Sequence, residues 1–148
     1  MIYLLDVNVL LSIVDRAHLH HRSVFRWFHE VATVSGWATC SITENGFVRI
    51  LSQISYPNAT LTPAAAGDLL GQLKSSSSGL CQFWPSDVSI TDQRIFALEL
   101  LTGTKQTTDL YLAGLAFSNG GKFATLAGRV AWRAVRGAGE DLIERVPI

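Results

Sequence analysis

Three acidic side chains stand where strand-like segments end or helix-like segments begin. Asp6 ends the apolar run over residues 2–5, Glu44 lies one turn after the run over 36–40, and Asp109 opens an apolar helical segment. Carboxylates gathered at one edge of a sheet would repel one another unless a cation bound between them. Oxygen ligands favour Mg²⁺ or Mn²⁺ over zinc, and such ions activate water for attack on a phosphodiester. The three acids therefore indicate metal-dependent phosphodiester chemistry.

Each acid also has an ordinary structural explanation. Asp is a favoured helix N-cap, which suits Asp6. Ser41 and Glu44 have the spacing of a capping box, in which Glu44 would reach back to the Ser41 amide. Asp109, in a first helical turn, would complement the helix dipole. These explanations do not account for the recurrence of acids at helix starts that face one sheet edge, and the sequence leaves both interpretations open.

The elements that would position these acids alternate between strand and helix from end to end. Strand patterns cover residues 2–5, 36–40, 80–84, 122–126 and, as an edge strand, 142–146; helix patterns cover 7–14, 20–33, 41–51, a stretch from 63 to the serine-rich loop 75–79, 91–101, 107–119 and 130–135. Strands separated by helices are typical of a parallel sheet with helices on both faces. We expect a three-layer α/β/α fold with a mainly parallel sheet of four to five strands. Ligands of such sheets bind at the carboxyl ends of the strands, where Asp6 lies.

Length and composition favour one compact domain over residues 1–148. The chain is 48% hydrophobic and 16% charged, which fits a globular protein rather than a disordered one. No apolar run approaches the roughly 18 residues needed to cross a bilayer, and the N-terminus lacks the features of a signal peptide. The two cysteines, Cys40 and Cys81, stand in apolar surroundings and are expected to be buried, reduced thiols. These features predict a cytoplasmic protein without a membrane segment.

Formal net charge is zero, so any binding of nucleic acid must depend on local basic patches. Candidate RNA-binding residues are found near the C-terminus: Lys122, Arg129, Arg133 and Arg136. The last three have a spacing that would place them along one helix face. A solvated charged face explains the same spacing. Further arginines in the first half of the chain are Arg22, Arg26 and Arg49.

Three segments resemble the successive motifs of PIN-domain ribonucleases, and most closely those of the VapC toxins of bacterial toxin–antitoxin pairs. They are residues 6–11 (DVNVLL), 42–49 (ITENGFVR) and 108–116 (TDLYLAGLA). The resemblance covers nearly the whole chain, including residues 56–58 and the closing segment 134–138. The order and spacing of the motifs are more specific than any one of them.

This resemblance implies a site, a cofactor and partners. Asp6, Glu44 and Asp109 would be the metal-binding acids, and Asn8 would be a polar neighbour that orients water or metal. The family implies a Mg²⁺-dependent endoribonuclease (Mn²⁺ being the alternative ion) that cuts structured RNA, usually tRNA or ribosomal RNA. It also implies neutralisation by a VapB-type antitoxin, and a homodimer is expected. The apolar strip of Trp27 and Phe28, with Arg22 and Arg26 beside it, is the candidate antitoxin groove.

One departure from the family pattern concerns the segment after the fourth predicted strand. The family usually has Thr, an apolar residue and then Asp there, whereas this chain has Thr125, Leu126 and Ala127. A methyl group cannot bind a metal ion or orient water. The alanine could be an engineered change that silences a toxic nuclease, or it could be natural, with the remaining acids and Asn8 sufficient for one ion.

Two further interpretations remain open from the sequence. One is a non-catalytic PIN-like module that keeps the fold and a partner surface. The other is a haloacid-dehalogenase-type phosphatase, which also begins with an apolar strand and an Asp. That family needs a second acid where Asn8 stands and an acidic pair where Ala127 and Gly128 stand. The phosphatase is therefore the weaker alternative.

Overall fold

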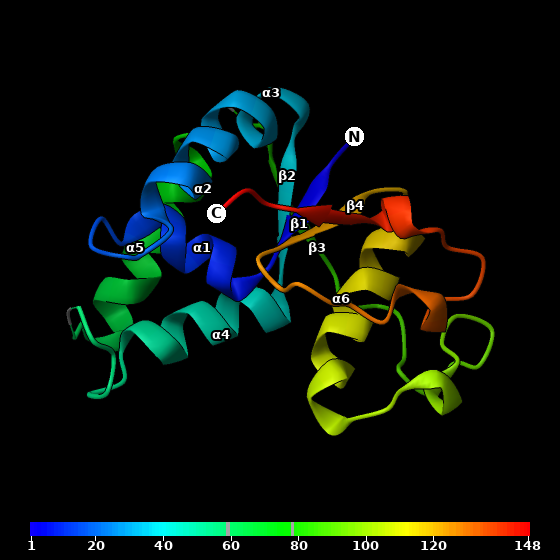
Figure 1. Cartoon of the computed structure of the whole chain (residues 1–148). Coiled ribbons are helices and arrows are strands. Elements are labelled where there is room, and N and C mark those ends of the chain that lie inside the picture. Colours follow the sequence, from blue (N-terminus) through cyan, green and yellow to red (C-terminus); the bar gives the residue numbers. More distant parts are fainter. Residues whose placement is uncertain (59, 78) are drawn as a thin grey trace.

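The computed structural model describes residues 1–58, 60–77 and 79–148, and its centre is one five-stranded sheet. The strands are β1 (Tyr3–Leu5), β2 (Trp37–Cys40), β3 (Cys81–Trp84), β4 (Lys122–Thr125) and β5 (Ile143–Arg145). Their order across the sheet is β3-β2-β1-β4-β5, and every neighbouring pair is parallel. Helices lie on both sides of the sheet (Figure 1). The predicted three-layer α/β/α architecture is confirmed, with β5 as an edge strand.

One face of the sheet is covered by most of the helices. These are α1 (Val7–Val14), α2 (His21–Trp27), α4 (Ser41–Leu51) and α5 (Pro63–Ser75). Their apolar side chains pack with Leu5 and Trp37 of the strands in one continuous core. The predicted helix over 20–33 is present, but it passes from α2 through a π-helical segment, Phe28–Ala32, into α3 (Thr33–Ser35).

The other face packs against α6 (Thr107–Ser118) and against irregular segments of the chain. The helices predicted over 91–101 and 130–135 are wrong: only short 3₁₀ turns form there, Leu98–Leu100 and Trp132–Ala134. The two segments bond to each other instead, because the Ala97 amide donates to the Ala134 carbonyl and the Arg136 amide to the Ile95 carbonyl. The buried side chains of Phe96 and Val135 hold this pairing against α6.

Two helical glycines allow a neighbouring segment to approach closely. A Cβ on Gly46 of α4 would lie 2.8 Å from a methyl group of Val7, the first residue of α1. A Cβ on Gly114 of α6 would lie 2.2 Å from the ring of Phe96. Contacts this short would force the neighbouring side chain to shift, which a close-packed core resists, so both positions favour a residue without a Cβ. Gly46 thereby brings the start of α4 beside the start of α1.

Both cysteines are free thiols; Cys40 is buried as predicted, whereas Cys81 on the edge strand β3 is only half-buried. Within the described parts of the chain, no helix has the length and apolarity required to cross a membrane.

Candidate active site

Asp6 lies at the carboxyl end of the central strand β1 and is the N-cap of α1. Its Oδ1 accepts a hydrogen bond from the Val7 amide at 2.7 Å, and its Oδ2 accepts one from the Thr125 hydroxyl at 2.9 Å. The side chain is buried, and burial raises the pKa of this carboxyl group although the two hydrogen bonds act in the opposite direction. Asp6 is thus both a helix cap and a carboxylate held firmly at the sheet edge.

Asp109 lies in the first turn of α6, where its negative charge complements the helix dipole. Its side chain is half-buried. Burial and the negative charge of Asp6 raise its pKa to about 6. The structure therefore brings Asp6 and Asp109 close enough for their charges to interact. A carboxyl pair that resists ionisation in this way is a setting in which a divalent cation with oxygen ligands would be favourable.

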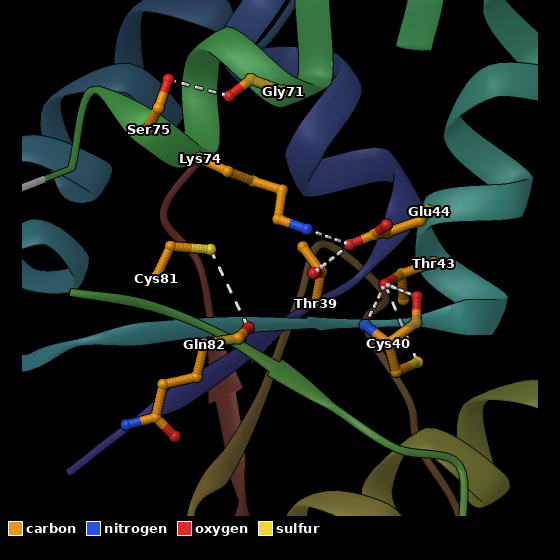
Figure 2. A network of polar contacts seen from close by, with 9 residues as sticks. All are labelled: Thr39, Cys40, Thr43, Glu44, Gly71, Lys74, Ser75, Cys81 and Gln82. Atoms are coloured by element: carbon orange, nitrogen blue, oxygen red, sulfur yellow. Dashed lines mark hydrogen bonds and ion pairs between the residues drawn. The ribbon is translucent and has the colours of Figure 1, made fainter. Parts of the chain in front are cut away.

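Glu44 takes part in a different set of contacts. One of its oxygens, Oε2, accepts from the Thr39 hydroxyl at 2.5 Å and lies 2.6 Å from the Lys74 ammonium of α5 (Figure 2). The capping-box explanation is wrong, since the N-cap is Cys40 and its amide donates to the hydroxyl of Thr43. Glu44 is consequently directed toward α5 and β2 rather than back along its own helix.

The predicted convergence of three acids is seen only in part. Among the described residues, no group of three or more His, Cys, Asp or Glu side chains is placed to hold a metal ion together. Asp6 and Asp109 adjoin, whereas the carboxylate of Glu44 is neutralised by Lys74. The hard oxygen donors of the aspartate pair fit Mg²⁺ or Mn²⁺.

Residue 127 adjoins the Asp6 carboxylate through a shared hydroxyl. The Ala127 amide donates to the Thr125 hydroxyl oxygen at 3.1 Å, and the same hydroxyl donates to Asp6. A longer acidic side chain at position 127 would therefore start next to the aspartate pair. Asn8 lies exposed in the first turn of α1, two residues beyond Asp6.

A hollow of about 460 Å³ lies between helices α1, α4 and α6, beside these acids. It is lined by Val7, Ser41, Ile42, Asn45, Gly46, Arg49 and Thr108. Thr108 immediately precedes Asp109, and Val7 immediately follows Asp6. A bound molecule in this hollow would lie beside the aspartate pair and within reach of a guanidinium group.

The basic residues predicted to bind RNA do not form one patch. Lys122 begins β4, so it lies at the amino end of the strand, opposite the edge that carries Asp6. Arg129 is exposed in the loop that follows β4, and Arg133 lies over the Trp132 ring at 4.9 Å. The prediction that Arg129, Arg133 and Arg136 share a helix face is wrong, because no helix forms there.

The aromatic strip predicted to bind the antitoxin packs in the core. Trp27 is 5% exposed and Phe28 is 2% exposed, and their rings pack edge-on against Tyr3 and Trp37 respectively. Both rings are thus fixed in the core, although Trp27 also lines a hollow along α2 together with Arg22 and Arg26. That this strip binds an antitoxin stays a prediction. Arg22 and Arg26 are exposed on the same helix.

Three residues of the site had no sequence signal strong enough to identify them. Thr125 and Thr39 each hold an acid from within an apolar strand, where a lone threonine has the pattern of a β-branched strand former. Lys74 comes from a helix 30 residues after Glu44. Thr125 lies next to Asp6 because β1 pairs with β4 in this register. The sequence alone does not reveal that pairing.

The chain is similar over most of its length to ribonucleases of Mycobacterium tuberculosis. It is 42% identical to "Ribonuclease VapC44" over 135 residues, which cover 91% of this chain and 92% of the relative. It is 36% identical to "Ribonuclease VapC39" over 142 residues, which cover 96% of this chain and all of the relative. No family model matches the chain.

The fold is similar to a chain in the crystal structure of VapBC2 from Rickettsia felis bound to a DNA fragment from their promoter. The TM-score is 0.55 at 18% identity, with 86% of this chain and 89% of that chain covered. These likenesses leave the haloacid-dehalogenase-type phosphatase without support.

Proposed function

The chain belongs to the VapC family of ribonucleases, and on that basis we propose that it is a metal-dependent endoribonuclease and the toxin of a toxin–antitoxin pair. The observation that carries the proposal is the pair of Asp6 and Asp109 at the carboxyl end of the sheet, where the charge of one raises the pKa of the other. Acids that disfavour each other's ionisation gain most from a cation bound between them.

Mg²⁺, or Mn²⁺ in its place, would be held by Asp6 and Asp109, and Glu44 would join them as the third acid only on leaving its ion pair with Lys74. When bound, such an ion supplies a Lewis acid and a water of lowered pKa for phosphodiester cleavage. The chain's own residues hold the acids in place: the Thr125 hydroxyl and the Val7 amide fix both oxygens of Asp6. Asn8, exposed in the same helical turn, is the proposed polar neighbour.

Lys74 neutralises Glu44, which reduces the repulsion that an RNA phosphate would meet at this edge. The proposed substrate is structured RNA, such as tRNA or ribosomal RNA. Arg49, which lines the hollow beside the acids, and Arg129, in the loop after β4, are the proposed phosphate contacts. Their exposure keeps both guanidinium groups available to a phosphate.

The ribonuclease activity of this sequence depends on the alanine at position 127. Its methyl group offers no ligand and no anchor for a metal-bound water, so we propose that the present chain binds metal weakly and cleaves slowly. The competing interpretation is a PIN-like binding module without activity. Restoring a carboxylate at position 127 separates the two.

A VapB-type antitoxin is the proposed protein partner. Its proposed contact is a hollow of about 410 Å³ along α2, near the C-terminus of the chain, lined by Arg22, Ser23, Arg26, Trp27, Glu30, Val31 and Pro147. Two exposed arginines beside a small apolar surface suit a partner segment that carries acidic and apolar side chains. A homodimer is also proposed.

RNA cleavage by three proteins tests the proposed activity: the present chain, Ala127→Asp, and Ala127→Asp combined with Asp6→Asn. We expect Ala127→Asp to cleave a panel of structured RNAs at least tenfold faster than the present chain, and Asp6→Asn to remove the gain. Ala127→Asn is the matched control, since it has the same size without the charge. EDTA should abolish cleavage by every active protein.

Cleavage that is insensitive to EDTA, or equal with Asp and Asn at position 127, would contradict a metal-dependent site at this edge. An absence of cleavage by all of the proteins would favour the non-catalytic module.

A further inference from the structure

Phe83 is a large aromatic side chain that the core does not cover. It lies on the edge strand β3 and is 49% exposed. The register pairs it with Thr39 of β2, so both side chains project from the same face of the sheet. Trp37, two residues before Thr39 on this face, is fully buried. The exposed ring thus lies beside the threonine that binds Glu44.

The ring forms one wall of a hollow of about 620 Å³. The lining residues are Ser41, Glu44, Asn45, Val48, Arg49, Ser52, Pro63 and Phe83. Helix α4 contributes an amide and a guanidinium group to the same lining, those of Asn45 and Arg49. Ser41, Asn45 and Arg49 also line the hollow beside Asp6 and Asp109, so the two hollows adjoin along α4.

The charge at this place favours an anion with an apolar, planar part. Glu44 is the one acid among the lining residues, and the Lys74 ammonium pairs with it at 2.6 Å (Figure 2). The same ammonium lies over the Phe83 ring, 5.5 Å from its centroid, so a base would stack on the opposite face of the ring. With Arg49 exposed, the hollow offers an aromatic face together with cationic groups. A nucleotide has the complementary parts: a flat base and a phosphate.

We propose that Phe83 is a stacking platform for one unpaired base of the RNA substrate, with Arg49 on the adjoining phosphate. This rests on the proposed ribonuclease function and adds the class of nucleotide that the site accepts. A base inside a duplex has both faces covered by its neighbours, so it cannot stack on a protein ring. The site therefore selects RNA that presents a loop, bulge or single-stranded end next to the cleaved bond.

The test is the affinity of a labelled single-stranded RNA, measured by fluorescence anisotropy in EDTA, where cleavage does not occur. We expect Phe83→Ala to weaken binding about tenfold and Phe83→Trp to retain it, because the indole offers an equal or larger face. Phe117→Ala is the matched control: Phe117 is 41% exposed, but it lies near the end of α6, away from the hollow. A fully paired RNA of equal length should bind all four proteins alike. Thermal melting of each variant verifies the fold.

Unchanged binding of single-stranded RNA by Phe83→Ala would overturn the proposal, as would loss in Phe83→Trp or an equal loss for the paired RNA. Absence of measurable binding by the unaltered chain would overturn it as well. A change in self-association or in antitoxin binding, with RNA affinity intact, would assign the ring to a protein interface instead. Failure of Ala127→Asp to cleave RNA would count against the proposed function alone, because the anisotropy measurement does not depend on cleavage.

Discussion

At the scale of single residues, the candidate site is defined by what surrounds each carboxylate. Asp6 has hydrogen-bond donors on both oxygens, and Glu44 has a lysine and a threonine. Asp109 has burial and a neighbouring negative charge, which together raise its pKa to about 6. Of the three acids, Asp109 is therefore the one whose ionisation most clearly destabilises the folded protein.

Asp109→Asn should stabilise the metal-free protein at neutral and alkaline pH. A shift from 3.8 to about 6 corresponds to roughly 3 kcal/mol, and solvent screening of this half-buried side chain reduces the expected gain to roughly 1 kcal/mol. Between these two pKa values the unfolded chain releases a proton that the folded chain retains, so the free energy of unfolding falls as pH rises. The gain from asparagine should be complete above pH 6 and largely lost near pH 4.

Urea unfolding in EDTA at pH 8 and pH 4 measures this difference. Adding Mn²⁺ at pH 8 should then stabilise the unaltered chain more than Asp109→Asn. A variant that is less stable than the parent at pH 8 would show that Asp109 is not destabilised by its surroundings.

At the scale of elements, periodicity predicted the strands and the helices that pack on them, and it was wrong where chain segments pair with each other. Helix α4 has the predicted bounds, and α1 follows Asp6 as expected. Residues 91–101 carry a helix-like pattern, yet their backbone bonds go to the segment around residue 135. The local hydrophobic pattern of a segment carries no information about such long-range backbone pairing. For the same reason the sequence predicted Asp6 and Asp109 at one edge but not the contact between Glu44 and Lys74.

Gly114→Ala tests the packing of α6, the helix that carries Asp109. The added methyl group would overlap the ring of Phe96, and we expect a loss of about 1–3 kcal/mol in the free energy of unfolding. Gly71→Ala is the control, because its Cβ would meet no atom within 4 Å and alanine favours the interior of α5. That variant should gain up to about 1 kcal/mol. Equal stability of the two variants, measured by urea unfolding, would contradict the close contact at Gly114.

At the scale of the whole molecule, the site is assembled from widely separated parts of the chain. Asp6 follows β1, Glu44 lies on α4, Asp109 begins α6, and Thr125 ends β4. A parallel sheet brings these positions to one edge because all of its strands end on the same side. Trp27 at the end of α2 and Phe28 at the start of the π-helical segment belong to the core that packs on this sheet. Trp27→Ala is therefore expected to reduce stability by about 3–5 kcal/mol and is unsuitable for locating an antitoxin.

Titration of Mn²⁺ by calorimetry is the most direct test of a metal-dependent site at this edge. The proteins are the present chain, Ala127→Asp, and Ala127→Asp with Asp6→Asn. We expect Ala127→Asp to bind the ion at least tenfold more tightly than the present chain, because the new carboxylate starts beside Asp6, and we expect Asp6→Asn to remove the gain. Equal affinity with alanine or aspartate at position 127 would place that residue outside the site and contradict the proposed metal centre.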